Sequence, residues 1–248
     1  MLRSCRIPLL LALVVAIAPA RGKTFSGPEA SIENACRAQA MLGPGTWSRL
    51  IRIENRAERS VYPREVFALV FEFADILWFY TDTDGTQSFS LHRNDLAAEK
   101  ADFGPLLRDI EPGFASYVPV APAPRKSRGG ALRNGCFIES IAALSDRLAR
   151  GELISRAELL SYYAGVRGRL RGHTVLIYEA ARGAFVFDPA DQRATRIGAT
   201  LPDDPLATAR RLRPMLDIGK ARWVPVLGGR LVAGAGAGRP DTPAGKIL

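Results

Sequence analysis

The hydrophobic residues in the first half of the chain gather in short runs, which predicts a series of strands after one short helix. Residues 31–42 are rich in helix-forming residues and stop at a Gly-Pro-Gly break. β-Branched and aromatic residues then gather in runs at residues 50–53, 66–73, 76–80 and 86–91. A turn signal at residues 82–85 joins the last two runs as a hairpin, and residues 96–110 predict two short helices.

In the second half, apolar residues recur at three- and four-residue spacing after Cys136 and predict a helix that ends near Gly151. A capping-box pattern at residues 155–158 predicts a second helix through residue 163, and residues 167–172 predict a basic turn. Residues 173–179 and 184–188 predict two strands that meet at a turn near residues 181–183. A further helix is expected at residues 204–212 and a last strand at residues 222–227. Together these elements predict an α+β fold.

Cys136 stands where a loop turns into the first helix of the second half. The first N–H groups of a helix have no intrahelical acceptor and the helix dipole is positive there, so a thiolate at Cys136 would be stabilised. Asn134 is a favoured helix cap, and Gly135 lets the backbone turn tightly and leaves room for a substrate. Cys136 is therefore a candidate nucleophile. The alternative is a buried cysteine that only packs in the core.

The predicted strand pair contains a base and an acid for this nucleophile. His173 begins the first strand, and Asp188 ends the second. Residues equally far from the centre of an antiparallel hairpin lie opposite one another, and a turn centred between residues 180 and 181 places Asp188 opposite His173. We therefore expect His173 to take the thiol proton of Cys136 and Asp188 to orient the imidazole ring.

Attack of a thiolate on a carbonyl creates an oxyanion, and the Cys136 backbone N–H is its expected first donor. Gln87 and Trp78, both in the predicted upstream hairpin, are candidates for the second donor. The alternative for Gln87 is an exposed strand residue, and the alternative for Trp78 is a core residue. The chain has one other histidine, His92, which is expected to be structural or exposed.

Short segments around these residues resemble the transglutaminase-like branch of the papain-like cysteine enzymes. They are Asn134-Gly135-Cys136 at a helix start, Gly172-His173-Thr174-Val175 on a strand, and Ala184-Phe185-Val186-Phe187-Asp188-Pro189 on the next strand. In that family a Cys, His, Asp triad occurs in this order, and the acid commonly precedes a proline. The resemblance covers residues 133–190 and implies a papain-like fold, with the Cys-bearing helix packed on an antiparallel sheet. Residues 78–87 are also similar to a segment of bacterial transglutaminase-like proteins.

The resemblance implies acyl transfer from a peptide or protein amide through a thioester on Cys136, as in a peptidase, an amidase or a transglutaminase-like enzyme. The chain departs from the family at two positions: Val175 stands where family members often carry an aromatic residue, and Gly135 stands where a Trp is usual. These departures concern transamidation activity more than the presence of the triad. A catalytically inactive binding or scaffold protein of the same fold is the alternative. No cofactor or metal is expected, because the histidines and acids show no ligand spacing.

Residues 1–20 match a secretory signal peptide, with two arginines, an apolar run and an Ala-Pro-Ala site. The apolar run is too short to span a membrane comfortably, so we expect a periplasmic or secreted protein. Cleavage would remove Cys5 and leave Cys36 and Cys136. These two either form a disulfide or stay reduced, with Cys136 as the nucleophile.

Shifts in composition divide the rest of the chain. Residues 21–118 are expected to form an N-terminal α+β region with hairpins, residues 119–132 a Pro/Gly/Arg-rich connector, residues 133–227 the catalytic region, and residues 228–248 a disordered tail. The chain carries 34 Lys and Arg against 25 Asp and Glu, a net charge of +9. Its arginines are scattered and not interleaved with aromatic residues, which indicates a solvated basic face and argues against a nucleic acid as a partner.

Overall fold

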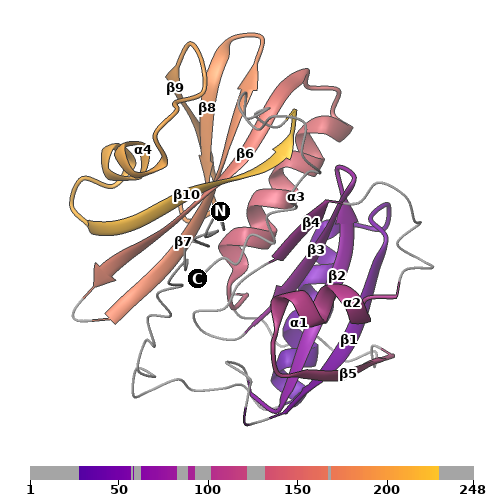
Figure 1. Cartoon of the computed structure of the whole chain (residues 1–248). Coiled ribbons are helices and arrows are strands. Elements are labelled where there is room, and N and C mark those ends of the chain that lie inside the picture. Colours follow the sequence, from indigo (N-terminus) through magenta and orange to yellow (C-terminus); the bar gives the residue numbers. More distant parts are fainter. Residues whose placement is uncertain are drawn as a thin grey trace, which may run out of the picture.

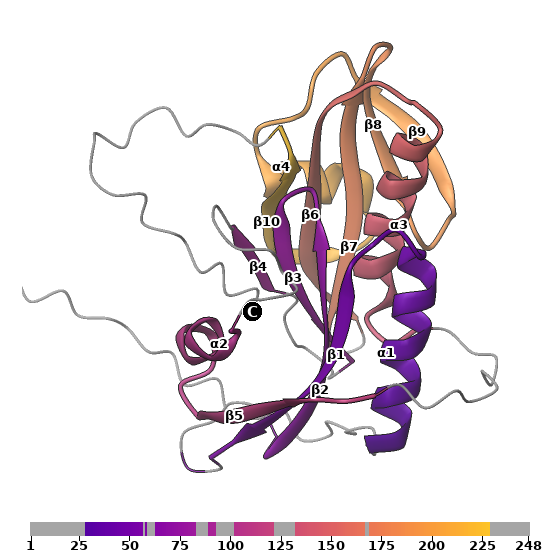
Figure 2. The same cartoon turned by 90° about the vertical axis from the view of Figure 1, so that its right-hand side faces the viewer.

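The computed structural model describes residues 28–56, 58, 63–82, 89–92, 102–121, 132–166 and 169–228. The described residues form two antiparallel sheets, with helix α1 (Pro28–Leu42) against the first and helix α3 (Gly135–Ala149) against the second (Figure 1). Both sheets and both helices contribute to one hydrophobic core. The two helices also contact each other and lie side by side (Figure 2). The described part of the chain is thus a mixed α+β fold with few helices and two antiparallel sheets.

The first sheet has the strand order β4-β3-β2-β1-β5. Its strands are β1 (Ser48–Asn55), β2 (Glu65–Phe73), β3 (Ile76–Thr81), β4 (Phe89–His92) and β5 (Phe114–Pro119). Phe71 and Trp78 belong to the face that shares a core with α1 and α3. Val70 and Phe79 belong to the opposite face, which α2 (Gly104–Ile110) covers.

The second sheet has the strand order β10-β6-β7-β8-β9. Its strands are β6 (Ile154–Val166), β7 (Arg169–Ala180), β8 (Gly183–Asp188), β9 (Arg193–Gly198) and β10 (Asp217–Leu227). One face packs on α3 through residues such as Leu159 and Leu176. The other face packs on α4 (Pro205–Leu212) through residues such as Leu160 and Ile177.

The predicted helix over residues 155–163 is wrong, because these residues belong to strand β6. β6 lies between β10 and β7, and both of its faces are buried: Leu159 belongs to the core beside α3, and Leu160 to the core beside α4. A strand buried on both faces loses the alternation of polar and apolar residues, so its sequence resembles that of a buried helix.

The predicted pair of strands β7 and β8 is present, but its turn is shifted by one residue. Leu176 pairs with Phe187, so Asp188 lies opposite Val175 and diagonal to His173. Side chains two residues apart on a strand share a face, so this register still leaves Asp188 and His173 on the same face of the sheet.

The remaining elements agree with the sequence in part. Strands β5 and β9 were not expected, and β7 begins at Arg169, within the region predicted as a basic turn. The expected signal peptide, most of the connector and nearly all of the expected tail lie outside the described residues. Within the described part of the chain, no helix is long and apolar enough to cross a membrane.

Candidate active site

Cys136 is the second residue of α3 and is partly buried at the start of the helix. Phe137, Ile138 and Ile141 follow it and are buried in the core shared by the two sheets. One turn after Cys136, the Ser140 hydroxyl donates a hydrogen bond to the Thr174 carbonyl of β7 (3.5 Å). This bond and the burial of the apolar face fix the first turn of α3 beside the strand that carries His173.

The residues directly before Cys136 differ from the sequence expectation. Asn134 occupies the predicted N-cap position of α3, but its backbone is left-handed (φ 52°) and its side chain makes no capping bond. Its Nδ2 donates instead to the Thr81 carbonyl at the end of β3 (3.0 Å). Gly135 is buried, and a Cβ atom there would lie 2.8 Å from Leu132 Cβ, so a side chain at this position requires the loop to shift.

Helix α1 and the first sheet hold the same loop through the backbone of Arg133. Asn34 Oδ1 accepts from the Arg133 N–H (2.9 Å), and Asn34 Nδ2 donates to the Arg133 carbonyl (3.4 Å). The Tyr80 hydroxyl donates to the same carbonyl and accepts from Asn34 Nδ2 (2.7 Å). Both side chains are buried, so the approach to the nucleophile is fixed by groups far away in the sequence.

His173 links Cys136 to Asp188. Its Nε2 lies 2.9 Å from Asp188 Oδ1, and the imidazole also makes a side-chain hydrogen bond with Cys136. Because Nε2 faces the carboxylate, Nδ1 is the ring nitrogen left for the thiol. The Ala190 N–H donates to the same carboxylate oxygen (2.8 Å). The structure therefore brings together the three side chains that the sequence singled out, from α3, β7 and the end of β8.

The charges around His173 favour its protonated form. Burial lowers the pKa of His173, but hydrogen bonds with Asp188 and Cys136 and their negative charges outweigh it and raise that pKa to about 9. Burial alone would raise the pKa of Asp188. Hydrogen bonds from His173 and Ala190, with the positive charges of His173 and Arg213, hold that pKa below its ordinary value. An imidazolium beside a cysteine is the arrangement that activates a thiol as a nucleophile.

Two residues at the site were missed by the sequence reasoning. Arg213, in the segment after α4, forms an ion pair with Asp188 through Oδ2, and its Nη2 lies 3.4 Å from Asp191 Oδ2. Tyr162 of β6 lies edge-on to the His173 ring, with 5.6 Å between the ring centroids. No local motif marks either residue, because Tyr162 meets His173 only through the pairing of β6 and β7, and Arg213 reaches Asp188 from the end of α4.

The remaining candidates named from the sequence are Trp78, Gln87 and His92. Trp78 is fully buried, its Nε1 donates to the Phe73 carbonyl (3.1 Å), and its ring packs on Phe137, so it belongs to the core and has no N–H left for an oxyanion. Gln87 lies outside the described residues. His92 ends β4, the edge strand of the first sheet, and its backbone pairs with Ile76 of β3.

Both described cysteines, Cys36 of α1 and Cys136, are free thiols. No family model matches the chain, and no curated protein or solved structure matches it either. What the site can do follows from its side chains: a thiol, a base hydrogen-bonded to it and a carboxylate that orients the base are sufficient for nucleophilic attack on an acyl group.

Proposed function

We propose that the protein is an exported, cysteine-dependent acyl-transfer enzyme of papain-like architecture that acts through a thioester on Cys136. The observation that carries this proposal is that the His173 ring hydrogen-bonds both Cys136 and Asp188. A cysteine that only fills space in a core needs no charged base, and a base with an orienting carboxylate is the arrangement that activates a nucleophile.

The reaction begins from the pair in which His173 already holds the thiol proton, and the Cys136 sulfur attacks the carbonyl carbon of an amide. A carbon–sulfur bond forms, and the electron pair of the carbonyl moves to its oxygen. The Cys136 N–H, in the first turn of α3, donates to this oxyanion. The carbonyl then re-forms, the carbon–nitrogen bond breaks, and the amine leaves with the proton from His173.

The thioester is resolved by a second nucleophile. Water gives a carboxylic acid, as in a peptidase or an amidase, whereas a primary amine gives a new amide, as in a transglutaminase-like enzyme. In both cases His173 takes a proton from the attacking molecule and returns it to the Cys136 sulfur. Asp188 keeps the ring in the tautomer that serves both steps.

The arrangement of the elements supports the papain-like architecture. A Cys-bearing helix packs on an antiparallel sheet, and adjacent strands of that sheet carry His173 and Asp188. This is the order and placement that the resemblance to transglutaminase-like enzymes implies. The signal-like residues 1–20 support export to the periplasm or the medium, and a peptide or protein amide is the proposed substrate.

The test is incubation of the purified protein with casein and a fluorescent primary amine. Transamidation makes casein fluorescent, and hydrolysis creates new amino termini without fluorescence. Either product must disappear in Cys136→Ala and persist in Cys36→Ala, which removes the other described thiol. If casein is unchanged and iodoacetamide labels Cys136 no faster than Cys36 at mildly acidic pH, the proposal is wrong, and a binding or scaffold protein is the better description.

A further inference from the structure

Asp188 is held from two sides. One carboxylate oxygen, Oδ1, faces His173 Nε2 (2.9 Å) and accepts from the Ala190 N–H (2.8 Å). The other oxygen, Oδ2, accepts from the Arg213 guanidinium. The Asp188 side chain is 13% exposed, so little water reaches it to replace a lost partner. Arg213 therefore decides how the oxygen that does not touch the histidine is held.

Tyr162 connects the same guanidinium to the histidine. It pairs with His173 across β6 and β7, and the two rings meet edge-on with an interplanar angle of 73°. The Tyr162 hydroxyl accepts a hydrogen bond from Arg213. His173, Asp188, Arg213 and Tyr162 thus form a closed ring of contacts, in which each side chain touches the next.

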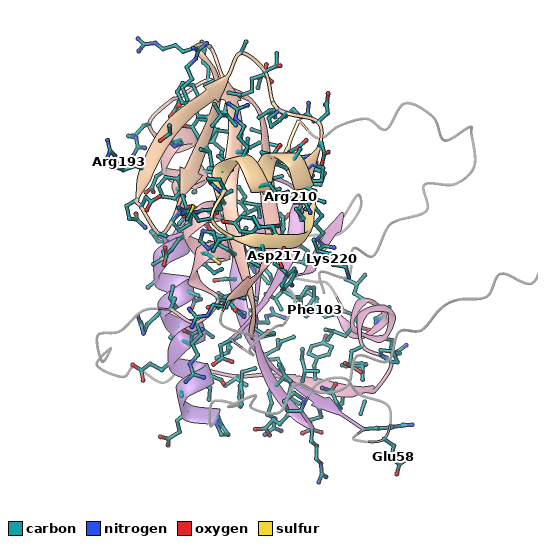
Figure 3. All side chains as sticks on the ribbon, turned by 90° about the vertical axis from the view of Figure 1, so that its left-hand side faces the viewer. Glu58, Phe103, Arg193, Arg210, Asp217 and Lys220 are labelled. Carbon is teal, nitrogen blue, oxygen red and sulfur yellow. The ribbon has the colours of Figure 1, made fainter. Side chains whose placement is uncertain are left out.

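Helix α4 fixes the position of Arg213. Arg210 Nε donates to the Ile218 carbonyl of β10 (3.2 Å), and Arg211 Nη2 donates to the Ile197 carbonyl of β9 (2.9 Å). Figure 3 shows Arg210 on α4 close to the start of β10. The Arg213 N–H then caps the helix by donating to the Ala209 carbonyl (3.0 Å). The guanidinium consequently extends from a backbone anchored to both edge strands of the second sheet.

We propose that Arg213 and Tyr162 act together as positioning residues that hold the Asp188 carboxylate and the His173 ring in register with Cys136. This inference rests on the proposed function and names two residues that the Cys, His, Asp order does not contain. A guanidinium suits the task because its planar fork can donate to a carboxylate and a phenol oxygen at once, whereas an ammonium is a point charge.

Loss of Arg213 or of the Tyr162 hydroxyl should make the Cys136 thiolate harder to form. Without Arg213, Asp188 Oδ2 loses its guanidinium partner, and the carboxylate is held through Oδ1 alone and orients the imidazolium less well. The removed positive charge also stabilises the thiolate less. Both effects require a higher pH to form the reactive thiolate–imidazolium pair. A purely structural role in docking α4 would change thermal stability but would leave the pH dependence of Cys136 reactivity unaltered.

The test measures the rate of Cys136 alkylation by iodoacetamide against pH, with Cys36 quantified in the same digest as the reference. In Arg213→Met the acidic limb of the rate profile should move to higher pH by about one unit. At a fixed pH on that limb, the alkylation of Cys136 is then about tenfold slower. Tyr162→Phe, which keeps the ring edge and loses only the hydroxyl, should show a smaller shift in the same direction. Arg211→Met removes a neighbouring arginine whose bond goes to β9 and should leave the profile unchanged.

Two further variants decide between charge and geometry. Arg213→Lys should recover only part of the lost rate, and the double variant Arg213→Met/Tyr162→Phe should react no more slowly than Arg213→Met alone, because the two residues act as a unit. Full recovery in Arg213→Lys, additive losses in the double variant, or unshifted profiles would each overturn the inference. If Arg213→Met does not fold, Tyr162→Phe and Arg213→Lys decide it. Absence of an acid-side reactive thiol in the wild-type protein would instead refute the proposed function.

Discussion

The proton on His173 makes the stability of the folded chain depend on pH, and His173→Gln isolates this effect. Glutamine keeps an amide that can hydrogen-bond Asp188 but cannot carry the proton. The pKa of His173 is about 9 in the folded chain, against an ordinary value of 6.5. The folded state therefore binds this proton more tightly than the unfolded chain does, and the proton stabilises it.

The size of the effect follows from the two pKa values. The change from 6.5 to about 9 corresponds to about 3 kcal/mol of free energy of unfolding. This stabilisation is fully present below pH 6.5 and is lost as the pH rises through 9. The His173 side chain is 25% exposed, so solvent screens the interaction only in part. Asp188 acts in a different window, because a lowered pKa gives stability that is lost only as the pH falls through the folded value.

Urea unfolding of the wild-type protein and His173→Gln at about pH 6 and about pH 10 tests this effect. The difference between their free energies of unfolding should shrink by about 3 kcal/mol over that range. Cys136→Ala should move the change to lower pH, because Cys136 contributes both a hydrogen bond and a charge to the proton on His173. A difference that stays constant from acid to alkaline pH would refute the placement of His173 between two anionic partners.

Two substitutions test the loop before the nucleophile and the assignment of Trp78. Gly135→Ala puts a Cβ atom 2.8 Å from Leu132 Cβ, so it should destabilise the chain by about 1–3 kcal/mol and slow Cys136 alkylation. Gly219→Ala is the neutral control, because a Cβ atom there would have no neighbouring atom within 4 Å. An unchanged melting temperature in Gly135→Ala contradicts the tight packing. Trp78→Phe removes the bond to the Phe73 carbonyl and should cost about 1–3 kcal/mol without changing the alkylation profile, whereas a lost acid limb would assign Trp78 to the site.

The sequence alone predicted those elements whose apolar, turn or capping residues lie within a single segment. The helix of Cys136 has a single apolar face, and the strand pair that holds His173 and Asp188 has a turn between two strongly β-forming runs. Helix α4 likewise has Asp204 as its cap, whose Oδ1 accepts from the Leu206 N–H (2.8 Å). These elements could be predicted because the pattern of apolar, turn or capping residues that marks each one lies within its own segment.

Tertiary context decided the elements that were missed. The capping-box pattern at residues 155–158 failed because Ser155 donates its hydroxyl to the Glu179 carbonyl of β7 (3.3 Å) instead of capping a helix. The one-residue shift of the β7–β8 turn places Val175 opposite Asp188, where the sequence predicted His173. The two residues are two positions apart on β7, so their side chains lie on the same face, and Asp188 still reaches His173. Arg213 and Tyr162 had no local signal, since their partners are distant in sequence and meet them only in the folded sheet.

The pH profile of alkylation at the two free cysteines, in the wild-type protein and in His173→Gln, tests the central claim most directly. Burial and the charge of Glu33 raise the pKa of Cys36, so this thiol should react only as the solution becomes alkaline. Cys136, paired with the imidazolium, should react at least about tenfold faster than Cys36 at about pH 6, and His173→Gln should abolish this advantage. A Cys136 rate that follows that of Cys36 across the range, with or without His173, would contradict a thiolate–imidazolium pair.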